Sequence, residues 1–448
     1  NAYGLSTPTQ EQYRCEHIAD RAKGYGMKSL ILDGNNILEI YSKLQPVIEE
    51  MRNHPHPVLV EFKTFRRRGH EEASGTKYVP EALMQYWEAK DPIENYEKHL
   101  LETGVLSLEK AEHIKSTFRA KILDELEVAY AKALPEPIVA EELNDVYAAH
   151  SNSPKKEVSA GNRALRMIDA IRESMFQSMQ HYPELVIMGQ DIAEYGGVFK
   201  ATEGFVDVFG KDRVRNTPIC ESGVVEVAMG LAIQNFKSIV EMQFGDFASS
   251  GFNPIVNYLA KSHYRWNQNA DVVIRMPCGA GVSAGPFHSQ TNEAWFLKTP
   301  GLKVVYPSNA FDAKGLLCTA ISDPNPVIYF EHKKLYRSQE DSVPENYYEL
   351  PLGKAKIIQE GNACTVVSYG MALHRVKEII DELQLDVELI DLRSLQPWDK
   401  STVFNSIKKT GKVLITTEDS LSLSFASEIA AVIAEEMFEF LDAPVCRS

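Results

Sequence analysis

The segment VVIRMPCGAGVSAG, residues 272–285, joins an apolar strand to a glycine-rich turn and decides the fold class. Its first half is apolar almost throughout, as central strands of a parallel sheet covered on both faces must be. Runs of the same texture recur at LVIM (185–188), SIVEMQF (238–244), LKVVYP (302–307) and VIYFEH (327–332). Because helical patterns separate these runs, the spacing predicts an α/β fold.

The glycine-rich turn is also a loose match to a dinucleotide-binding fingerprint, Gly279-x-Gly281-x-x-Ala284. That fingerprint needs a helix directly after it and an acidic residue about 20 positions further on. Neither follows here, because GPFHSQTNEAW (285–295) contains a proline and the next strand ends without a carboxylate. We therefore interpret the glycines as a turn that lets the backbone approach a neighbour closely.

Similar α/β patterns flank this central block. On the N-terminal side, KSLILDG (28–34) and PVLVEFKTF (57–65) read as strands around the helical pattern of residues 36–51. Mostly helical patterns then run to about Ala133, with Ser107 placed as an N-cap. On the C-terminal side, three strands alternate with helices, the last helix covering residues 424–441; the strands are CTVVSYG (364–370), VELIDLR (387–393) and KVLITTED (412–419).

The composition is that of a globular enzyme and argues against nucleic-acid or membrane binding. The 448 residues include 47 Lys and Arg against 62 Asp and Glu, a net charge of −15, whereas nucleic-acid readers cluster positive charge. No apolar run reaches the ~18–20 residues of a membrane span. Six dispersed cysteines without a CxxC pair indicate a reducing compartment, and we expect a cytoplasmic location.

Two loops of the N-terminal block hold candidate site residues. In Asn1-Ala2-Tyr3-Gly4, an amide oxygen and a main-chain carbonyl are hard ligands that Mg²⁺ accepts beside phosphates, although such a loop is also an ordinary turn. In RRRGHEEASG (66–75), His70 belongs either to a solvated charge run or to a site where it donates a proton or contacts phosphate.

The central block holds four more candidates. Gln243, Phe247 and His288 follow strand ends, where α/β sheets place their ligands. Glu221 lies just ahead of an apolar helix, where a carboxylate is either a partner of the helix dipole or, in a buried interface, a proton donor to a ring nitrogen. Each signal is weak alone, but their order along the chain is specific.

With these motifs in this order, the chain resembles the thiamine-diphosphate-dependent first component of the 2-oxo acid dehydrogenases, specifically the branched-chain (2-oxoisovalerate) type. Residues 1–134 are similar to the later part of its α subunit and residues 163–448 to most of its β subunit, fused in one polypeptide. The stretch STPTQEQYR favours the branched-chain type over pyruvate dehydrogenase. The resemblance rests on NAYGLSTPTQEQYR, RRRGH, GGVFKATEGF, RVRNTPICESG, EMQFGDF, FHSQTNEAWF, KTPGLKVVYPS, LQPWD and SEIAA.

The resemblance implies three-layer thiamine-diphosphate-binding folds followed by a transketolase C-terminal-like α/β domain. Residues 1–134 would be the C-terminal part of the diphosphate-binding domain, and 135–162 a linker. Residues 163–340 would be the pyrimidine-binding domain, and 341–448 the final domain, incomplete. The Gly-Asp-Gly half of the family's diphosphate motif is absent from the sequence, so we expect the chain to be truncated at both ends.

The resemblance also assigns roles near the cofactor ring. Glu221 matches the carboxylate that hydrogen-bonds the aminopyrimidine and promotes formation of the ylide. Phe247 would stack on the pyrimidine, and Gln243 would line the same pocket. His70 matches a histidine near the diphosphate and substrate carbonyl, and His288 one that acts as an acid during acyl transfer.

Metal ligands are implied in the same way. Asn1 and the main-chain oxygen of Tyr3 match ligands of Mg²⁺, and Leu5 lies in the same cofactor-binding loop. Asp323 and Asn325 resemble a loop that holds a structural monovalent cation such as K⁺.

The implied activity is oxidative decarboxylation of branched-chain 2-oxo acids, with acyl transfer to the lipoyl domain of a dihydrolipoyl acyltransferase. Fusion of the two subunits implies a homodimer in place of a heterotetramer. Three alternatives stay open: the same chemistry on pyruvate or acetoin, transketolase-like ketol transfer, and a scaffold without catalytic activity.

Overall fold

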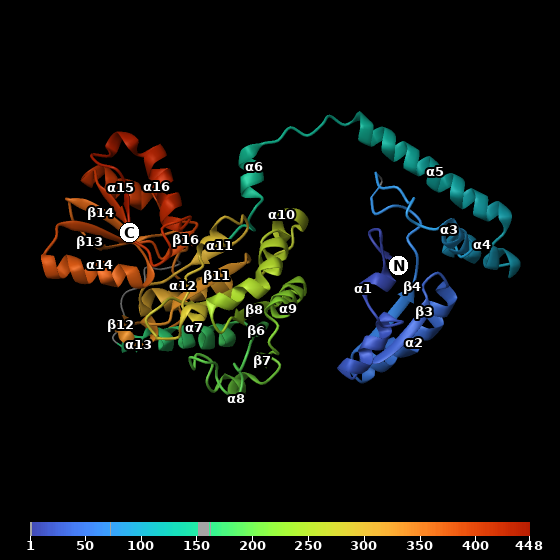
Figure 1. Ribbon diagram of the computed structural model, residues 1–448, viewed down its shortest axis with the longest axis horizontal. Coiled ribbons are helices and arrows are strands. Elements are labelled where there is room, and N and C mark those ends of the chain that lie inside the picture. The colour runs from blue at the N-terminus through green and yellow to red at the C-terminus, as the bar shows by residue number, and fades with distance from the viewer. Residues whose placement is uncertain (1, 72, 151–160, 162) are drawn as a thin grey trace. The chain divides into compact units, whose positions relative to one another are not determined.

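The computed structural model describes residues 2–71, 73–150, 161 and 163–448 (Figure 1). The chain folds into two compact units, Asn1–Glu136 and Pro137–Ser448, which we call unit 1 and unit 2. Within the described residues, no helix combines the length and apolarity that crossing a membrane requires.

Unit 1 is built on a parallel strand–helix–strand motif. Strand β3 (Lys28–Asp33) pairs in parallel with β4 (Val58–Lys63), and α2 (Ile37–Asn53) connects them, as the sequence pattern predicts. The remaining elements are β1 (Tyr3–Gly4), β2 (Thr7–Pro8), α1 (Thr9–Gln12), the 3₁₀ helix η1 (Ile18–Tyr25), α3 (Glu81–Glu88), α4 (Pro92–Glu102) and α5 (Leu108–Ala131). Ser107 caps α5 as predicted, because its side chain accepts a hydrogen bond from the Lys110 N–H at 3.2 Å.

The segment expected to be a linker is partly ordered, and from Pro137 on it belongs to unit 2. It contains α6 (Val139–Asn144), and the side chain of Asn325 bonds both the N–H and the carbonyl of Ala148, at 2.8 and 3.0 Å. Satisfying these two main-chain groups holds the segment in place, a long-range contact that local periodicity does not reveal. Residues 151–160 and 162 of the expected linker lie outside the described residues.

The main sheet of unit 2 has seven strands in the order β16-β10-β11-β9-β8-β6-β7. All neighbours are parallel except the edge strand β16, which pairs antiparallel with β10. Every strand predicted for the central block is present. The bounds are β6 (Leu185–Gly189), β7 (Val214–Asn216), β8 (Lys237–Glu241), β9 (Val272–Cys278), β10 (Lys303–Val305), β11 (Val327–His332) and β16 (Ser394–Gln396).

Both faces of this sheet are covered, which explains the unbroken apolar runs. Leu185 and Ile187 of β6 point into a core shared with α7 (Met167–His181) and α12 (Ala310–Ser322). Val186 and Met188, on the opposite face, pack with residues of α9 (Glu221–Ile233) and the π-helix η3 (Pro254–Leu259). Smaller elements complete the layer: β5 (Arg163–Arg166) paired with β12 (Glu340–Val343), α8 (Phe205–Phe209), η2 (Gly245–Gly251), α10 (Ser262–Trp266), η4 (Pro286–His288), α11 (Ala294–Leu297) and α13 (Leu335–Ser338).

The C-terminal part of unit 2 forms a second sheet in the order β13-β15-β14-β17-β18. Only β13 is antiparallel, so the four parallel strands form a doubly wound sheet whose direction of winding reverses between β14 and β17. The elements are β13 (Lys356–Gln359), β14 (Cys364–Ser368), α14 (Gly370–Leu383), β15 (Val387–Asp391), α15 (Lys400–Thr410), β17 (Val413–Ile415), α16 (Phe425–Glu436) and β18 (Cys446–Arg447). The helix expected to reach residue 441 ends at Glu436, and the 3₁₀ turn η5 (Phe438–Phe440) follows.

Candidate active site

The helix α9 begins at Glu221, and this carboxylate is half-buried at the carboxyl edge of the main sheet. Gln190, which follows β6, donates from Nε2 to Glu221 Oε1 at 3.4 Å. Gly251, at the end of η2, approaches the start of α9 so closely that an added Cβ would lie 3.4 Å from the Glu221 carbonyl. The turn that carries Phe247 therefore packs against the helix end that carries Glu221.

Two of the predicted residues, Phe247 and His288, meet in an aromatic cluster with Phe244. The His288 ring lies edge-on to Phe244 at 4.6 Å and to Phe247 at 5.4 Å, measured between centroids. Gln243 precedes Phe244 in the segment that follows β8, and its Nε2 lies 3.5 Å from Asp191 Oδ2. Sequence reasoning missed Phe244 and Asp191, although Phe244 ends the predicted strand 238–244 and Asp191 follows the predicted strand 185–188.

A buried charge cluster, Glu241–Arg275–Glu331, fixes the strand ends beneath these side chains. Arg275 Nε and Nη2 donate to the two oxygens of Glu331 at 2.7 and 2.8 Å, and Nη1 donates to Glu241. Burial raises the pKa of Glu241, although the positive charge of Arg275 acts to lower it. Tyr336 donates to Glu331 at 2.6 Å. These ion pairs join the neighbouring strands β8, β9 and β11, and Gln243 and Phe244 follow the first of them.

The glycine-rich turn after β9 makes the close approach that its sequence predicts. Gly279 has φ +82°, and an added Cβ would lie 2.1 Å from the ring of His332. The carbonyl of Gly279 accepts a hydrogen bond from Lys333 Nζ at 2.8 Å, and this ammonium lies 5.6 Å from the centroid of the Phe244 ring. Burial lowers the pKa of Lys333. This lysine is a further residue near the site that the sequence pattern did not single out.

Unit 1 brings the loop of Tyr3 and Leu5 to the segment that leads to His70. Arg66 donates to the Leu5 carbonyl at 3.4 Å, and Leu5 adopts φ +57° in the turn between β1 and β2. His70 is exposed in the loop after β4. In the β1–β2 pair, Tyr3 lies opposite Pro8. Because proline has no N–H, it cannot donate a hydrogen bond to the carbonyl of Tyr3.

The described residues fit the expected cofactor ring in unit 2 and give a partial fit to the metal in unit 1. A carboxylate, an amide and an aromatic face are the groups that bind a flat ring with a hydrogen-bonding edge. Asn1 lies outside the described residues, which leaves the Tyr3 carbonyl as the one predicted Mg²⁺ ligand seen there. Among the described residues, no group of three His, Cys, Asp or Glu side chains could hold a metal ion.

The predicted monovalent-cation loop already has protein partners. Lys303 Nζ lies 2.5 Å from Asp323 Oδ2, and Asn325 donates from its N–H and Nδ2 to Asp323 Oδ1. Asn325 Oδ1 accepts from Ala148. These side-chain oxygens do not fit a cation in this arrangement. A K⁺ ion at this loop stays a prediction, and main-chain oxygens would have to bind it.

Comparison with protein families matches almost the whole chain. Residues 1–138 match the family described as "Dehydrogenase E1 component", 163–339 the "Transketolase, pyrimidine binding domain" and 353–448 the "Transketolase, C-terminal domain". A solved chain described as a split-gene transketolase, inactive β4 tetramer, has a TM-score of 0.51 at 21% identity, covering 64% of this chain and 89% of that one. These matches confirm the predicted fold class.

Curated relatives include enzymes of two substrate types. The 2-oxoisovalerate dehydrogenase subunit beta of Bacillus subtilis is 42% identical over 285 residues, 62% of this chain and 87% of the relative. The mitochondrial 2-oxoisovalerate dehydrogenase subunit beta of Dictyostelium discoideum is 43% identical over 305 residues, 66% of this chain and 82% of the relative. The pyruvate dehydrogenase E1 component subunit beta of Mycoplasma pneumoniae is 39% identical over 293 residues, 64% of this chain and 88% of the relative.

The α-type match at the N-terminus and the β-type matches after it lie in one polypeptide. The chain therefore belongs to the thiamine-diphosphate-dependent E1 components of the 2-oxo acid dehydrogenases, with α-type and β-type regions fused.

Proposed function

We propose that this protein decarboxylates branched-chain 2-oxo acids such as 2-oxoisovalerate and passes the acyl group to the lipoyl domain of a dihydrolipoyl acyltransferase. The observation that carries the proposal is the packing of η2 against the start of α9. Helix α9 begins with Glu221, and η2 carries Phe247, whose ring contacts His288. This arrangement combines an acid, an aromatic face and an imidazole at the edge of one sheet.

Each side chain has a distinct task in this proposal. Thiamine diphosphate, when bound, supplies the electron sink for decarboxylation. Glu221 would share a proton with a ring nitrogen of the cofactor, and Gln190, which donates a hydrogen bond to this carboxylate, would orient it. Phe247 would stack on the ring, and Gln243 would bind its polar edge. His288, held edge-on by two phenylalanines, would deliver a proton during acyl transfer.

The remaining predicted residues belong to unit 1 and stay proposals. Asn1 and the Tyr3 carbonyl would bind Mg²⁺ beside the diphosphate, Leu5 would contact the cofactor, and His70 would contact the diphosphate and the substrate carbonyl. Because these residues and Glu221 belong to different units, we propose that two copies of the chain form a homodimer with composite sites.

Support for the branched-chain substrate comes from the STPTQEQYR stretch and from the 2-oxoisovalerate dehydrogenase relatives at 42% and 43% identity. Pyruvate is the second candidate, because a pyruvate dehydrogenase subunit is 39% identical over a similar range. These identities differ too little to separate the two substrates without an assay.

The test is 2-oxo-acid-dependent dye reduction by the full-length protein with thiamine diphosphate and Mg²⁺, comparing 2-oxoisovalerate with pyruvate. We expect a higher kcat/KM for 2-oxoisovalerate. Glu221→Gln should lower turnover by at least about 10²-fold, the range of a lost proton-transfer group, while thiamine diphosphate still binds. A preference for pyruvate would keep the chemistry and reject the branched-chain assignment, and unchanged turnover in Glu221→Gln would reject the proposed role of the carboxylate.

A further inference from the structure

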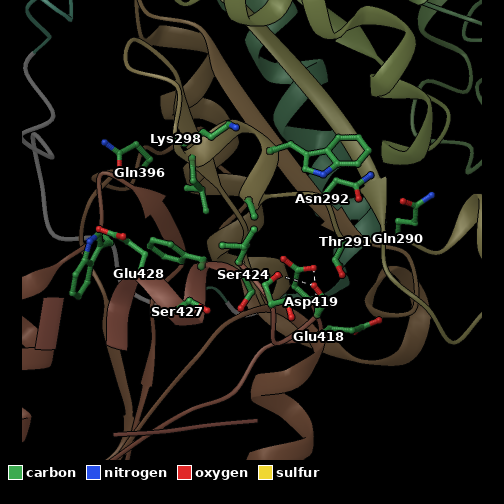
Figure 2. A pocket seen from close by; sticks show the side chains of 18 of the residues that line it. Gln290, Thr291, Asn292, Lys298, Gln396, Glu418, Asp419, Ser424, Ser427 and Glu428 are labelled. Carbon is green, nitrogen blue, oxygen red and sulfur yellow. Dashed lines mark hydrogen bonds between the residues drawn. The ribbon is translucent and has the colours of Figure 1, made fainter. Parts of the chain in front are cut away.

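Unit 2 contains a cavity that none of the proposed catalytic groups uses. It has a volume of about 1210 Å³ and lies between residues 280–298, which follow β9, and residues 396–428, which lead from the edge strand β16 into the C-terminal sheet. Figure 2 shows side chains from both segments facing this space. Ligand sites commonly measure roughly 300–1,000 Å³, so the space is ample for a small molecule.

The cavity lies at the carboxyl end of β17, one of the two strands between which the winding of the C-terminal sheet reverses. Strand β17 ends at Ile415, the loop after it supplies Glu418 and Asp419, and α16 begins in the cavity wall at Phe425. The direction of winding reverses between β14 and β17, and ligands of open α/β sheets bind at the carboxyl ends of such neighbouring strands.

Two buried polar groups in the wall have no partner among the described residues. Asn292 is 5% exposed and its Nδ2 makes no hydrogen bond, and Ser424 is 3% exposed and its Oγ makes none. Ser424 directly precedes α16, yet its side chain does not cap the helix. Buried donors without partners are costly, so this pair calls for an acceptor from a ligand.

The charged side chains that line the cavity are Lys298, Glu418, Asp419 and Glu428, and among them the carboxylate of Asp419 calls for a positive group. Asp419 is half-buried, and its one hydrogen bond within the described chain comes from the Ser420 N–H at 2.7 Å. Burial raises the pKa of Asp419. By contrast, Glu418 is already satisfied by His332 at 2.8 Å and by the Ala280 N–H at 2.7 Å. An ammonium group would neutralise Asp419, whereas a phosphate would be repelled by it.

Apolar side chains line the space beside these polar groups. Trp295, Leu297 and Phe425 contribute rings and methyl groups to the wall. A ligand that satisfies all three features needs an acceptor anion, an ammonium group and an apolar body within one small molecule.

We propose that this cavity binds an α-amino acid with an apolar side chain. Its ammonium group pairs with Asp419, and its carboxylate accepts from Asn292 and Ser424 at the positive end of α16. Its side chain packs on Trp295 and Phe425. A purely anionic ligand leaves Asp419 unpaired, and a purely cationic ligand leaves both donors unpaired.

The test is calorimetric titration of L-leucine into the full-length protein, with the fluorescence of Trp295 and Trp398 in the cavity wall as a second signal. Isoamylamine lacks the carboxylate and isocaproate lacks the ammonium group, so both should bind at least about tenfold more weakly, as each loses a charge-assisted contact. Equal binding of either compound would overturn the zwitterion assignment, as would the absence of saturable L-leucine binding.

Variants locate the binding. Asp419→Asn and Ser424→Ala should each weaken L-leucine binding by about tenfold. Glu435→Gln is the matched control, because Glu435 is exposed on α16 and does not line the cavity. Wild-type affinity in Asp419→Asn would overturn the proposal. Displacement of L-leucine by 2-oxoisovalerate, or loss of binding in Glu221→Gln, would place the amino acid in the proposed active site and also overturn it.

Discussion

Units 1 and 2 both tie one arginine to two carboxylates, but in different surroundings. In unit 1, Arg67 lies 2.9 Å from both Asp91 and Glu88, and its side chain is 39% exposed. In unit 2, Arg275 joins Glu331 and Glu241 with a side chain that is 1% exposed. Similar pairs therefore have different consequences, because water screens the first cluster and is excluded from the second.

The apolar residues of the two units differ in the same way. Among the described residues of unit 1, the buried apolar side chains are Ala19, Ala22, Leu32 and Ala111. Helix α5 exposes Phe118 and Ile122 at 62% and 58%. Unit 2 instead buries whole strands such as β9 and β11. We infer that unit 2 is stabilised by its core and unit 1 mainly by local structure.

The largest expected effect is on the buried charge cluster. Arg275→Met leaves two buried carboxylates without a cation and should lower the free energy of unfolding by ~3–5 kcal/mol. Urea unfolding followed by circular dichroism measures the change. Arg67→Met is the matched control and should leave the unfolding midpoint almost unchanged. Equal shifts in the two variants would contradict the difference drawn between the clusters.

The next effect tests the core of unit 2. Ile328 is fully buried in the central strand β11, so Ile328→Ala should cost about 3 kcal/mol in unfolding free energy through lost burial and a cavity. Ile37, at the start of α2 in unit 1, is 49% exposed, and Ile37→Ala should change stability far less. Thermal unfolding of both variants checks this, and a larger loss in Ile37→Ala would show that unit 1 buries that face.

Two carboxylates, Glu293 in unit 2 and Glu61 in unit 1, should contribute to the pH dependence of stability in opposite directions. Burial and the charge of Asp419 raise the pKa of Glu293 from 4.5 to about 7, against the hydrogen bond from Tyr369. The folded state holds this proton more tightly, so unit 2 should lose stability as pH rises from about 4.5 to about 7. In unit 1, burial alone would raise the pKa of Glu61, but hydrogen bonds from the Ala19 N–H and Lys63 lower it, so its contribution is lost on acidification.

Glu293→Gln tests this dependence directly. The amide keeps an acceptor for Tyr369 without a titratable proton, so unfolding of the variant should vary less between about pH 5 and about pH 8 than that of the wild type. Asp391, whose pKa burial also raises to about 7, leaves some of the slope in place. An unchanged slope in Glu293→Gln would mean that Glu293 titrates normally in the fold.

The smallest effect concerns local structure in unit 1. Ser107→Ala removes the N-cap bond to Lys110 and should cost about 1 kcal/mol, felt chiefly in α5. Hydrogen exchange of the α5 amides detects it. Ser116→Ala, in the middle of the same helix, is the control. Equal exchange in the two variants would show that the Ser107 cap does not stabilise α5.

The sequence by itself determined the features that depend on neighbouring residues. The apolar runs at 185–188 and 327–332 predicted covered parallel strands, and the position of Ser107 predicted the start of α5. Period and cap chemistry act within a few residues, so a local pattern is enough to reveal them. The order of Glu221, Phe247 and His288 along the chain predicted a site through the family resemblance, and their roles stay predictions.

Only the tertiary structure decided which distant polar groups meet inside unit 2. Nothing in the local pattern pairs Arg275 with Glu241 and Glu331, or places Asn292 and Ser424 in the wall of one cavity. These groups come from different helices, strands and loops. Whether each one finds a hydrogen-bond or ion-pair partner depends on how the packed sheets bury it and which groups lie beside it. Burial removes water from them, and that is why tertiary packing, and not residue type, sets which of them are paired and which are left open to a ligand.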